Sequence, residues 1–324
     1  MKKNYPIAKL LIAMIAGLIL VLIPFYTNEF YLNLGIILLM NFTAAITLWL
    51  LMQMGKLSLG HAAFMGIGSY TSALLSVKLG VPFIVAFLAS GIVAGLVGAA
   101  FGSLVLRLKG VYFTLVTFAF GEAVRLLFTA WVSVFGGPFG ISNIPAASLF
   151  GFTFDTKTEA YFLFLVLGIV VVLSMYKIVN SPVNRVIKGI NKAETLTQFL
   201  GVNTYSYKVI LFTISSMFMG FLGSIYAHYL RFIGPTEFTF WKTVDWITIN
   251  IIGGMGSMVG TLIGSLIIVP LPELLRGAVQ FQRILYGLII VLIILFAPQG
   301  LVGLWKKLTS KYKAAKSGVN SDGQ

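Results

Sequence analysis

Apolar runs of roughly 20 residues recur along this chain, and each is long enough to cross the hydrocarbon core of a bilayer as a helix. A segment in lipid must satisfy its backbone hydrogen bonds internally, which predicts helices for these runs. Only 10% of the residues are charged while 58% are hydrophobic, and this excludes an ordinary soluble domain. We therefore predict an all-α, polytopic transmembrane helical bundle that forms one domain over residues 1–306.

The bundle is expected to contain about ten spans, with about eight as the lower limit. A cluster of glycines at 253–256 leaves the region 244–275 open to three interpretations: two short spans, one bent helix, or a re-entrant turn. The first run follows Lys2 and Lys3 but is longer than the apolar part of a signal peptide, so we interpret it as a retained helix. The candidate spans cover residues 7–26, 32–52, 58–77, 82–106, 112–132, 160–178, 208–230, 244–257, 258–275 and 284–304.

The charged residues predict the orientation of the bundle in the membrane. The chain has 23 Lys and Arg against 9 Asp and Glu, and most of the basic residues fall on one side if the spans alternate. This bias is typical of the cytoplasmic side of a membrane protein, so the positive charge indicates a lipid bilayer as the partner and no nucleic acid. Ten spans would place both termini in the cytoplasm, including a polar tail at 307–324 that we expect to be disordered.

A polar segment at 180–207 separates two apolar runs and carries a helical pattern. Its apolar residues recur at spacings that put them on one face of a helix, and Gly201 supplies a stop signal after them. The segment contains no recognisable catalytic chemistry, so we interpret it as a docking surface on the cytoplasmic side for another subunit. The residues expected on the apolar face are Val186, Ile187, Ile190, Ala193, Leu196 and Leu200.

Two series of glycines are spaced three or four residues apart, which places each series on one face of a helix. Such faces allow a neighbouring backbone to approach closely. One interpretation is static helix packing, and the other is that these faces slide during a transport cycle. The first series is Gly91, Gly95, Gly98 and Gly102, and the second is Gly256, Gly260 and Gly264.

Several polar residues lie at membrane depth and are candidates for a substrate path. Glu122 is near the middle of its span, and Arg125 is three residues further on the same face, which predicts either a structural ion pair or a substrate contact. Asn250 and Asp245 near the start of another span allow the same two interpretations. An ion-coupled carrier that uses Glu122, Arg125 and Asp245 as a charge relay is an alternative class of function.

The segment 55–68 combines several glycines with Ser58, Gly60 and His61, and such a segment could break a helix and line a cavity. His61 is expected either to hydrogen-bond near a helix start or to touch the substrate path. A metal role is not expected, because only His228 could join it and the chain has no cysteine.

The sequence lacks the motifs of common enzymes. It has no G-x-x-x-x-G-K-[ST] phosphate loop, no H-E-x-x-H and no G-x-S-x-G. We therefore predict no catalytic residues, no cofactor and no metal, and any energy from ATP would have to come from another subunit. An intramembrane enzyme is the second alternative class of function.

Several motifs resemble the LivM-type permeases of branched-chain amino acid ABC transporters. The likeness extends over about residues 30–305, and the segment from Ala193 and Glu194 to Val202 is similar to the cytoplasmic loop of that family. The motifs are GKLSLGHAAFMGIGSY at 55–70, LRLKGVYF at 106–113, FAFGE at 118–122, LYG at 285–287 and APQGL at 297–301.

This resemblance implies a subunit of an ATP-driven importer in the cytoplasmic (inner) membrane. Its expected partners are a LivH-like second permease, two cytoplasmic ABC ATPase subunits and an extracytoplasmic substrate-binding protein. Branched-chain amino acids are the expected cargo, while urea, amides or sugars are carried by relatives of the same general fold. By analogy the segment 185–202 is the coupling helix, with Arg185, Ile190, Ala193, Glu194, Leu200 and Gly201 as expected contacts to the ATPase. Ala193-Glu194-Thr195 departs from the Glu-Ala-Ala pattern of many importers, so the individual contacts are expected to differ.

Overall fold

The computed structural model describes residues 27–149, 151–275, 281–297 and 300–305, together with Leu22, Pro24, Lys307 and Thr309. The predicted first span at 7–26 and the predicted polar tail at 307–324 lie almost entirely outside these residues. Helices dominate the described part of the chain, which confirms an all-α membrane protein with several apolar helices.

Four long helices form the first half of the bundle, and short connections join them. A glycine or a proline marks the start of three of them: Gly60 precedes α3, Pro82 precedes α4 and Gly110 precedes α5. Asn28 caps the other helix by accepting a hydrogen bond from the Tyr31 amide. The helices are α2 (Glu29–Gln53), α3 (His61–Leu79), α4 (Phe83–Val105) and α5 (Val111–Ala130).

The connection after α5 holds short elements at one end of the bundle. Two-residue strands pair antiparallel there, β1 with β4 and β2 with β3, so that the loop is tied to the segment that follows α9. The elements of this region are α6 (Val132–Phe135), the 3-10 helix η1 (Gly137–Phe139), β1 (Ile141–Ser142), β2 (Ser148–Leu149), β3 (Phe152–Thr153), β4 (Phe232–Ile233) and the 3-10 helix η2 (Pro235–Phe238).

The second half contains two long helices, the predicted amphipathic helix and a series of shorter helices. Thr156 starts α7 with a capping box that it forms with Glu159. Residues 300–305 are also helical. The elements are α7 (Lys157–Val179), α8 (Val183–Phe199), α9 (Thr204–Leu230), α10 (Phe240–Gly253), α11 (Met258–Ile268), α12 (Leu271–Leu274) and α13 (Gln282–Phe296).

The described residues contain five helices that are long and apolar enough to cross a membrane: α2, α4, α5, α7 and α9. A sixth candidate is the pair Pro235–Gly253 and Met258–Leu274, which is bent by 116° at the glycine cluster. The arms of this pair, α10 with 14 residues and α11 with 11, are each too short to span a roughly 30 Å core alone. The structure therefore favours a broken span or a re-entrant turn over two separate spans, and the predicted number of about ten is not confirmed.

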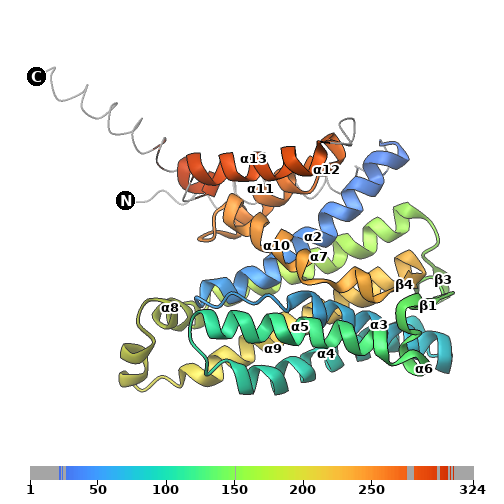
Figure 1. The fold of residues 1–324 in the computed structure, drawn as a ribbon, viewed down its shortest axis with the longest axis horizontal. Coiled ribbons are helices and arrows are strands. Elements are labelled where there is room, and N and C mark those ends of the chain that lie inside the picture. The colour runs from blue at the N-terminus through green and yellow to red at the C-terminus, as the bar shows by residue number, and fades with distance from the viewer. Residues whose placement is uncertain are drawn as a thin grey trace, which may run out of the picture.

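Helices α2 and α9 form the centre of the bundle. About two thirds or more of their spanning windows are buried, 72% for α2 and 67% for α9, whereas only 22% of the window of α5 is buried. In Figure 1, α9 lies with α3, α4 and α5 in one layer, while α2 and α7 separate this layer from α11 and α13. The long helices run across the view, with α8 at one end and the short strands at the other.

Close backbone contacts join α9 to its neighbours. A Cβ atom at Gly68 of α3 would lie 2.4 Å from the Gly220 Cα of α9, and one at Gly223 would lie 2.1 Å from the Met65 carbonyl oxygen. Only glycine allows the two backbones to approach this closely. Gly220 and Gly223 were not singled out in the sequence, and Gly68 was singled out only as one of the glycines that could break a helix.

The glycines that were singled out lie on two different surfaces. Those of α4 all face α9, where Cβ atoms would meet Phe221 at Gly91, Met217 at Gly95, Ser216 at Gly98 and Phe212 at Gly102. Gly260 and Gly264 of α11 face the backbone of α10. Gly256 differs from the prediction, because it lies in the turn between these helices and a Cβ there would have no neighbour within 4 Å.

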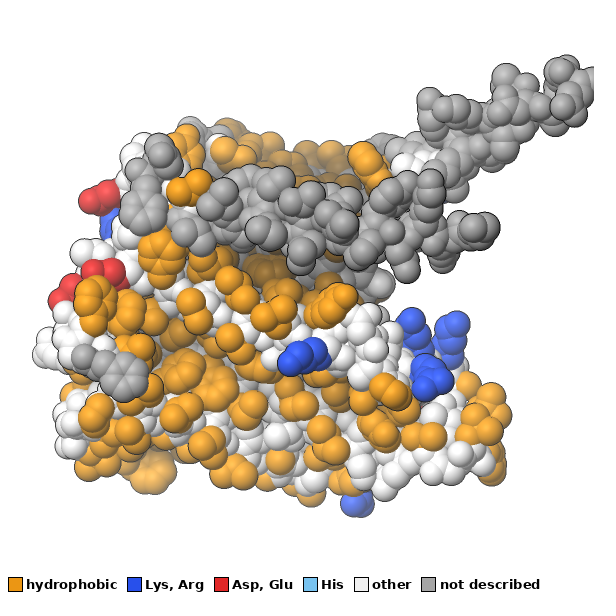
Figure 2. Space-filling model, turned by 180° about the vertical axis from the view of Figure 1, so that it is seen from behind, with side chains coloured by type: hydrophobic (Ala, Val, Ile, Leu, Met, Phe, Trp, Pro, Cys, Tyr) orange, Lys and Arg blue, Asp and Glu red, His pale blue; other side chains and the backbone are white. Residues whose placement is uncertain are grey.

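Basic side chains gather at one end of the bundle. Figure 2 shows an apolar surface with Lys and Arg gathered at the α8 end, while Asp and Glu at the opposite end have basic partners, in the pairs Glu29–Lys157, Asp155–Arg231 and Glu237–Lys242. The basic residues near α8 include Arg107, Lys109, Arg185, Lys188 and Lys192. An apolar band between two polar ends is the arrangement that a bilayer requires.

We predict that Gly68→Ala weakens the bundle, because the new methyl group would collide with the backbone of Gly220. Overpacking of this kind costs about 1–3 kcal/mol, which corresponds to a thermal unfolding midpoint lower by several degrees. Midpoints of the purified chain in detergent provide the measurement. Gly287→Ala is the matched control, since a Cβ at Gly287 would meet nothing within 4 Å. Equal midpoints for both variants would contradict the proposed contact.

Candidate functional site

The predicted site residues around His61 lie inside the bundle at the start of α3. The chain leaves α2 at Gln53, and residues 54–60 are not helical before α3 begins at His61. Ser58 and His61 are both fully buried. The predicted break of a helix at the glycines is wrong, because α3 starts at His61 and continues through Gly66 and Gly68.

Helix α5 holds this entry segment in place. The Leu59 amide donates to the Thr117 hydroxyl at 3.1 Å, and the Thr114 hydroxyl donates to the Leu57 carbonyl at 3.0 Å. Gly60 lies directly against α5, since a Cβ atom there would be 2.2 Å from the Thr117 carbonyl oxygen. The segment next to α3 is thus buried in protein and hydrogen-bonded by side chains, as non-helical backbone must be at membrane depth, while Gly55 and Leu57 nearer to α2 are exposed.

His61 connects three helices. Its Nε2 atom lies 3.1 Å from the Thr47 hydroxyl of α2 and 3.2 Å from the Ser215 hydroxyl of α9. Its Nδ1 atom is buried and has no hydrogen-bond partner among the described residues. The next amide of α3, that of Ala62, donates to the Thr243 hydroxyl of α10 at 3.0 Å. The start of α3 is therefore the point where α2, α5, α9 and α10 meet.

Glu122 and Arg125 form an ion pair on α5. Their nitrogen and oxygen atoms are 2.8 Å apart, and the two side chains are 24% and 27% exposed. The pair lies on a helix whose other side chains are largely exposed, including Leu115, Leu126 and Leu127. Two charges in the middle of an exposed apolar helix do not suit a lipid environment, so this face is a candidate for contact with another protein or with an aqueous path.

Asn250 is a structural residue in this conformation. Its amide nitrogen donates to the carbonyl oxygens of Ala45 and Trp246, and its amide oxygen accepts from the Thr261 hydroxyl at 2.7 Å. These bonds join α10 to α2 and α11, on both sides of the bend. Asn250 is fully buried, so the structure does not place it on an open path.

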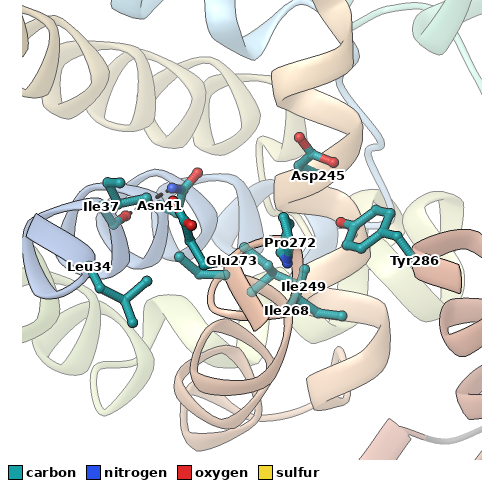
Figure 3. A pocket seen from close by; sticks show the side chains of 10 residues that line it. Leu34, Ile37, Asn41, Asp245, Ile249, Ile268, Pro272, Glu273 and Tyr286 are labelled. Atoms are coloured by element: carbon teal, nitrogen blue, oxygen red, sulfur yellow. Dashed lines mark hydrogen bonds between the residues drawn. The ribbon is translucent and has the colours of Figure 1, made fainter. Parts of the chain in front are cut away.

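Asp245 lies in a pocket of about 230 Å³ between α2, α10, α12 and α13. Figure 3 shows its carboxylate near the Tyr286 hydroxyl, with which it is hydrogen-bonded, while Asn41 and Glu273 lie further along the pocket. Apolar side chains complete the walls, among them Leu34, Ile37, Ile249 and Ile268. Asp245 has no hydrogen bond or ion pair with Glu122 or Arg125, so the described residues do not assemble the charge relay of the ion-coupled alternative.

Helix α8 differs from the predicted amphipathic helix in one important respect. Ala193 has extended backbone angles, φ −157° and ψ 81°, and divides α8 into two halves. A Cβ atom at Gly189 would lie 2.6 Å from the Thr197 hydroxyl, whereas residues eight apart in a straight helix are separated by about 12 Å. The second half therefore folds back beside the first.

The kink separates the predicted apolar face into a buried and an exposed part. Ile187 and Ile190 are buried against the bundle. Beyond the kink the apolar side chains point away from it, with 61% exposure for Leu196, 82% for Phe199 and 77% for Leu200. The prediction of one continuous apolar face is thus wrong after Ala193. Gly201 ends the helix with φ +81°, a left-handed conformation that suits glycine.

Glu194 anchors the kink of α8 to the bundle. Its carboxylate pairs with the buried ammonium group of Lys208 in α9 at 2.5 Å, and Lys208 also donates to the Leu106 carbonyl at the end of α4. Burial raises the pKa of Glu194, but the nearby ammonium groups of Lys208 and Lys56 and the Thr204 hydroxyl outweigh this and hold the pKa below its ordinary value. This pair could not be predicted from helical spacing, because its members are 14 residues apart in different helices.

A second connection joins α8 to the bend between α10 and α11. Asn191 donates to the Gln53 carbonyl at 2.9 Å, and the Gln53 side chain donates to the Met255 carbonyl in the bend. Trp49 donates to the same carbonyl oxygen at 2.8 Å. A pocket of about 370 Å³ opens between these segments. The docking helix is therefore bonded to α9 at Glu194 and to α2 and the bend through Asn191.

Among the described residues, no group of three or more His, Cys, Asp or Glu side chains could hold a metal ion. The predicted site positions fall into four places instead. Ser58, Gly60 and His61 meet at the start of α3, Glu122 and Arg125 pair on α5, Asn250 is buried between α10, α2 and α11, and the positions of α8 lie at one end of the bundle.

Comparison with known proteins identifies relatives over most of the chain. The family model described as branched-chain amino acid transport system / permease component matches residues 28–298. The chain is 33% identical to the high-affinity branched-chain amino acid transport system permease protein LivM of Escherichia coli over 81% of its own length and 67% of that protein. It is also 33% identical to the LivM protein of Salmonella typhimurium over 76% of its length and 64% of that protein.

The chain thus spans about two thirds of the length of these curated relatives. A more distant match, 24% identical over 70% of the chain and 72% of that protein, is the ribose import permease protein RbsC of Haemophilus influenzae. No solved structure gives a significant match to the chain.

We predict that Glu194→Gln destabilises the bundle, because it leaves the buried Lys208 ammonium group without its carboxylate. After allowance for the partial exposure of Glu194, the loss is about 2 kcal/mol in the free energy of unfolding at neutral pH. The pKa of Glu194 is lowered in the folded chain, so the stabilisation is present at neutral pH and is lost as the pH falls through that lowered value. Thermal midpoints at a series of pH values should show the difference from the unsubstituted chain shrinking under acid conditions.

The control for this prediction is Glu29→Gln. Glu29 also forms an ion pair, with Lys157 at 2.8 Å, but both side chains are exposed, so its loss should leave the midpoint unchanged. Equal decreases of the thermal midpoint for Glu194→Gln and Glu29→Gln would show that the burial of Lys208 does not strengthen the Glu194–Lys208 pair.

Proposed function

The chain belongs to the family of permease components of branched-chain amino acid transport systems, and we propose that it is the membrane-spanning permease subunit of an ATP-driven ABC importer for branched-chain amino acids. The observation that carries the proposal is the family match over residues 28–298, together with an amphipathic α8 that protrudes at the basic end of a transmembrane bundle. ATP hydrolysis takes place on partner subunits, because this chain has no phosphate loop of its own.

The α8 end of the bundle faces the cytoplasm in this proposal. The support is the gathering of Lys and Arg at that end, whereas Glu29, Asp155 and Glu237 at the other end are each paired with a basic residue (Figure 2). Both termini are placed on the cytoplasmic side, as the charge pattern of the sequence predicts; this requires an even number of spans, which the predicted set keeps if α10 and α11 form a re-entrant turn. The membrane is the cytoplasmic (inner) membrane, and the short strands β1–β4 face an extracytoplasmic substrate-binding protein.

Helix α8 serves as the coupling helix, and its exposed second half is the part that touches an ATPase subunit. Leu196, Phe199 and Leu200 offer three exposed apolar side chains beside the basic residues of the same helix. An exposed apolar cluster with a polar rim is typical of a protein interface. Of the residues expected from the resemblance, Arg185, Ala193, Leu200 and Gly201 are exposed and remain candidates for contact, whereas Ile190 is buried in the permease itself.

Two connections carry movement of α8 into the membrane. The Glu194–Lys208 pair joins it to α9 and to the end of α4, and the bonds through Asn191 and Gln53 join it to the bend at Met255. When ATP binding closes the two ATPase subunits, α8 moves with them and the spans switch access from one side to the other. Gly201 ends this lever in a conformation that a side chain would strain.

The exposed face of α5 is the side on which a LivH-like second permease lies, with the translocation path between the two subunits. The support is the Glu122–Arg125 pair, whose side chains remain 24% and 27% exposed on an apolar helix and whose charges would be costly against lipid. A partner on this face would remove the pair from lipid and complete the walls of a path near Ser58, Gly60 and His61. Asn250 contributes through the α10–α11 bend.

A different small solute is the second candidate for the cargo. The 24% identity with a ribose import permease favours it, because a related architecture there serves a sugar. Urea and amides belong to the same alternative. The chain is an ABC permease with either cargo. Measuring which solute the assembled importer takes up, with a binding protein of known ligand, distinguishes the two cargoes.

The orientation can be measured by cysteine labelling, because the chain contains no cysteine of its own. We expect a Phe139→Cys variant to react with a membrane-impermeant maleimide in right-side-out vesicles, since Phe139 is 85% exposed at the strand end. A Leu200→Cys variant should react only in inverted vesicles. The reverse pattern would mean that α8 lies outside the cell, and the coupling proposal would then fail.

Reconstitution tests the function itself. Proteoliposomes that contain this chain, the second permease, both ATPases and the binding protein should take up leucine only with ATP, and this chain alone should take up none under a proton or sodium gradient. We expect Phe199→Asp to reduce ATP-driven uptake roughly tenfold or more, because it places a charge in the apolar contact to the ATPase. The fold should be unaffected, since Phe199 is 82% exposed.

Co-purification of the ATPase subunits provides the control for this variant. Phe199→Asp should reduce it, whereas Phe139→Asp, an equally exposed position at the other end, should retain it. Gradient-driven uptake by the chain alone would instead support the ion-coupled carrier.

A further inference from the structure

Unpartnered polar atoms cluster around the start of α3. Among the described residues, four buried side-chain atoms have no hydrogen-bond partner, and three of them are Ser58 Oγ, His61 Nδ1 and Ser216 Oγ. Ser58 and His61 belong to the same entry segment, whereas the Ser216 hydroxyl lies against Gly98 of α4. Roughly nine in ten buried polar groups in proteins have a partner. Two exceptions only three residues apart, Ser58 and His61, indicate a site that a further molecule completes.

The hydrogen bonds around His61 determine which ring nitrogen carries the proton. The Thr47 hydroxyl donates its hydrogen to the Ala44 carbonyl at 2.7 Å, and the Ser215 hydroxyl donates to the Thr47 carbonyl at 2.8 Å. Each hydroxyl has only one hydrogen, so both offer lone pairs to Nε2 of His61. All four contacts are satisfied together when Nε2 is the protonated nitrogen and donates to the two hydroxyl oxygens.

The other ring nitrogen is consequently a free acceptor. A second proton on the ring would create a cation in a fully buried position whose described hydrogen-bond partners are neutral hydroxyl groups, and such a cation is costly. In the neutral ring, Nδ1 presents a lone pair with no donor facing it. The site thus requires a ligand group that donates a hydrogen bond.

His228 shows that the fold can satisfy a buried histidine completely. It is 2% exposed, and its Nδ1 atom donates to the Pro145 carbonyl at 2.7 Å. Its Nε2 atom lies 2.9 Å from the Ser72 hydroxyl. The chain has two histidines, and they are held in opposite tautomers with only one of them incomplete. The free acceptor at His61 is therefore a local feature of the α3 entry.

We propose that Nδ1 of His61 accepts a hydrogen bond from the ammonium group of the transported amino acid as it passes the start of α3. This proposal rests on the proposed function, and it specifies which chemical group of the solute the permease recognises. An ammonium group is the donor that all α-amino acids share, so the contact recognises the amino-acid backbone and not the side chain.

The surroundings suit the other half of a zwitterion. The hydroxyl group of Ser58 can donate to a carboxylate, and the start of the 19-residue α3 carries the positive end of the helix dipole. Backbone ends of helices inside a bundle bind charged groups of solutes in other transporters. The polar atoms of the site would therefore contact the ammonium and carboxylate groups and not the aliphatic side chain of the solute.

Access to the site runs past α5. Gly60 and Gly121 are in backbone contact, with a Cβ at Gly121 lying 3.1 Å from the Gly60 Cα, so no side chain separates the entry segment from α5. Arg125 lies one turn after Gly121 on the same side of α5, where it pairs with Glu122, and the two side chains are 27% and 24% exposed. A shift of this one helix would uncover the unpartnered atoms to the proposed path.

Nitrogen NMR tests the proposal directly. The full chain, labelled with ¹⁵N-histidine and held in lipid bilayers, should show one ring with the proton on Nε2 and the other with the proton on Nδ1. A His228→Gln variant assigns the two rings. Leucine should shift the unprotonated nitrogen of His61, whereas 4-methylpentanoate, which lacks the ammonium group, should not.

Two results would overturn the proposal. One is a His61 ring with its proton on Nδ1. The other is an Nδ1 signal that leucine leaves unchanged although the assembled importer transports leucine, as expected if a permanently bound water occupies the site.

Transport by a His61→Gln variant gives an independent measurement. The glutamine amide can still donate to Thr47 and Ser215 but lacks the acceptor at Nδ1. Loss of one hydrogen bond to a charged group should lower leucine import by roughly tenfold or more at subsaturating leucine, with co-purification of the ATPases unchanged. Unchanged import would contradict the contact. If the unsubstituted complex imports no leucine at all, the proposed function fails instead, so the two failures are distinguishable.

Discussion

Contact between the backbones of α3 and α9 is the constraint on which the rest of this bundle depends. Gly68, Gly220 and Gly223 leave no room for side chains between the two helices, and the Ser69 hydroxyl donates to the Gly223 carbonyl at 2.8 Å within the same contact. In lipid, where apolar surface alone does not drive helices together, such close approach supplies the attraction. It also sets α9 at a fixed distance from everything that α3 carries.

Helix α9 contacts functionally important segments along its whole length. Near its start Lys208 pairs with Glu194, in its middle Ser215 contacts His61, and near its end His228 holds the loop at Pro145. One helix therefore touches the docking helix, the candidate substrate site and the opposite end of the bundle. A displacement of α8 reaches the centre of the membrane through a single rigid element, which is the physical basis for coupling in the proposed importer.

Periodicity and charge predicted much of this architecture, but they could not predict contacts between distant segments. The glycines of α4 were found from their spacing because a regular helix puts them on one face, and they do face α9. The same rule misplaced Gly256, which lies in a turn where helical spacing has no meaning. The apolar spacing of α8 continues unchanged through Ala193, so the kink that exposes Phe199 and Leu200 left no signal in the sequence. The Glu194–Lys208 pair and the tautomer of His61 depend on helices brought together by the fold, and only the structure reveals them.

The kink at Ala193 divides α8 into a first half that packs against the bundle and a second half whose apolar side chains are exposed. Ile187 and Ile190 fill the core, so changes there are constrained by the stability of the bundle, while Leu196, Phe199 and Leu200 contribute little to it. In the proposed importer, substitutions in the second half would therefore change the contact with the ATPase subunit without disturbing the membrane core. A chimaera that exchanges only residues beyond the kink would be the economical way to make this permease work with a foreign ATPase.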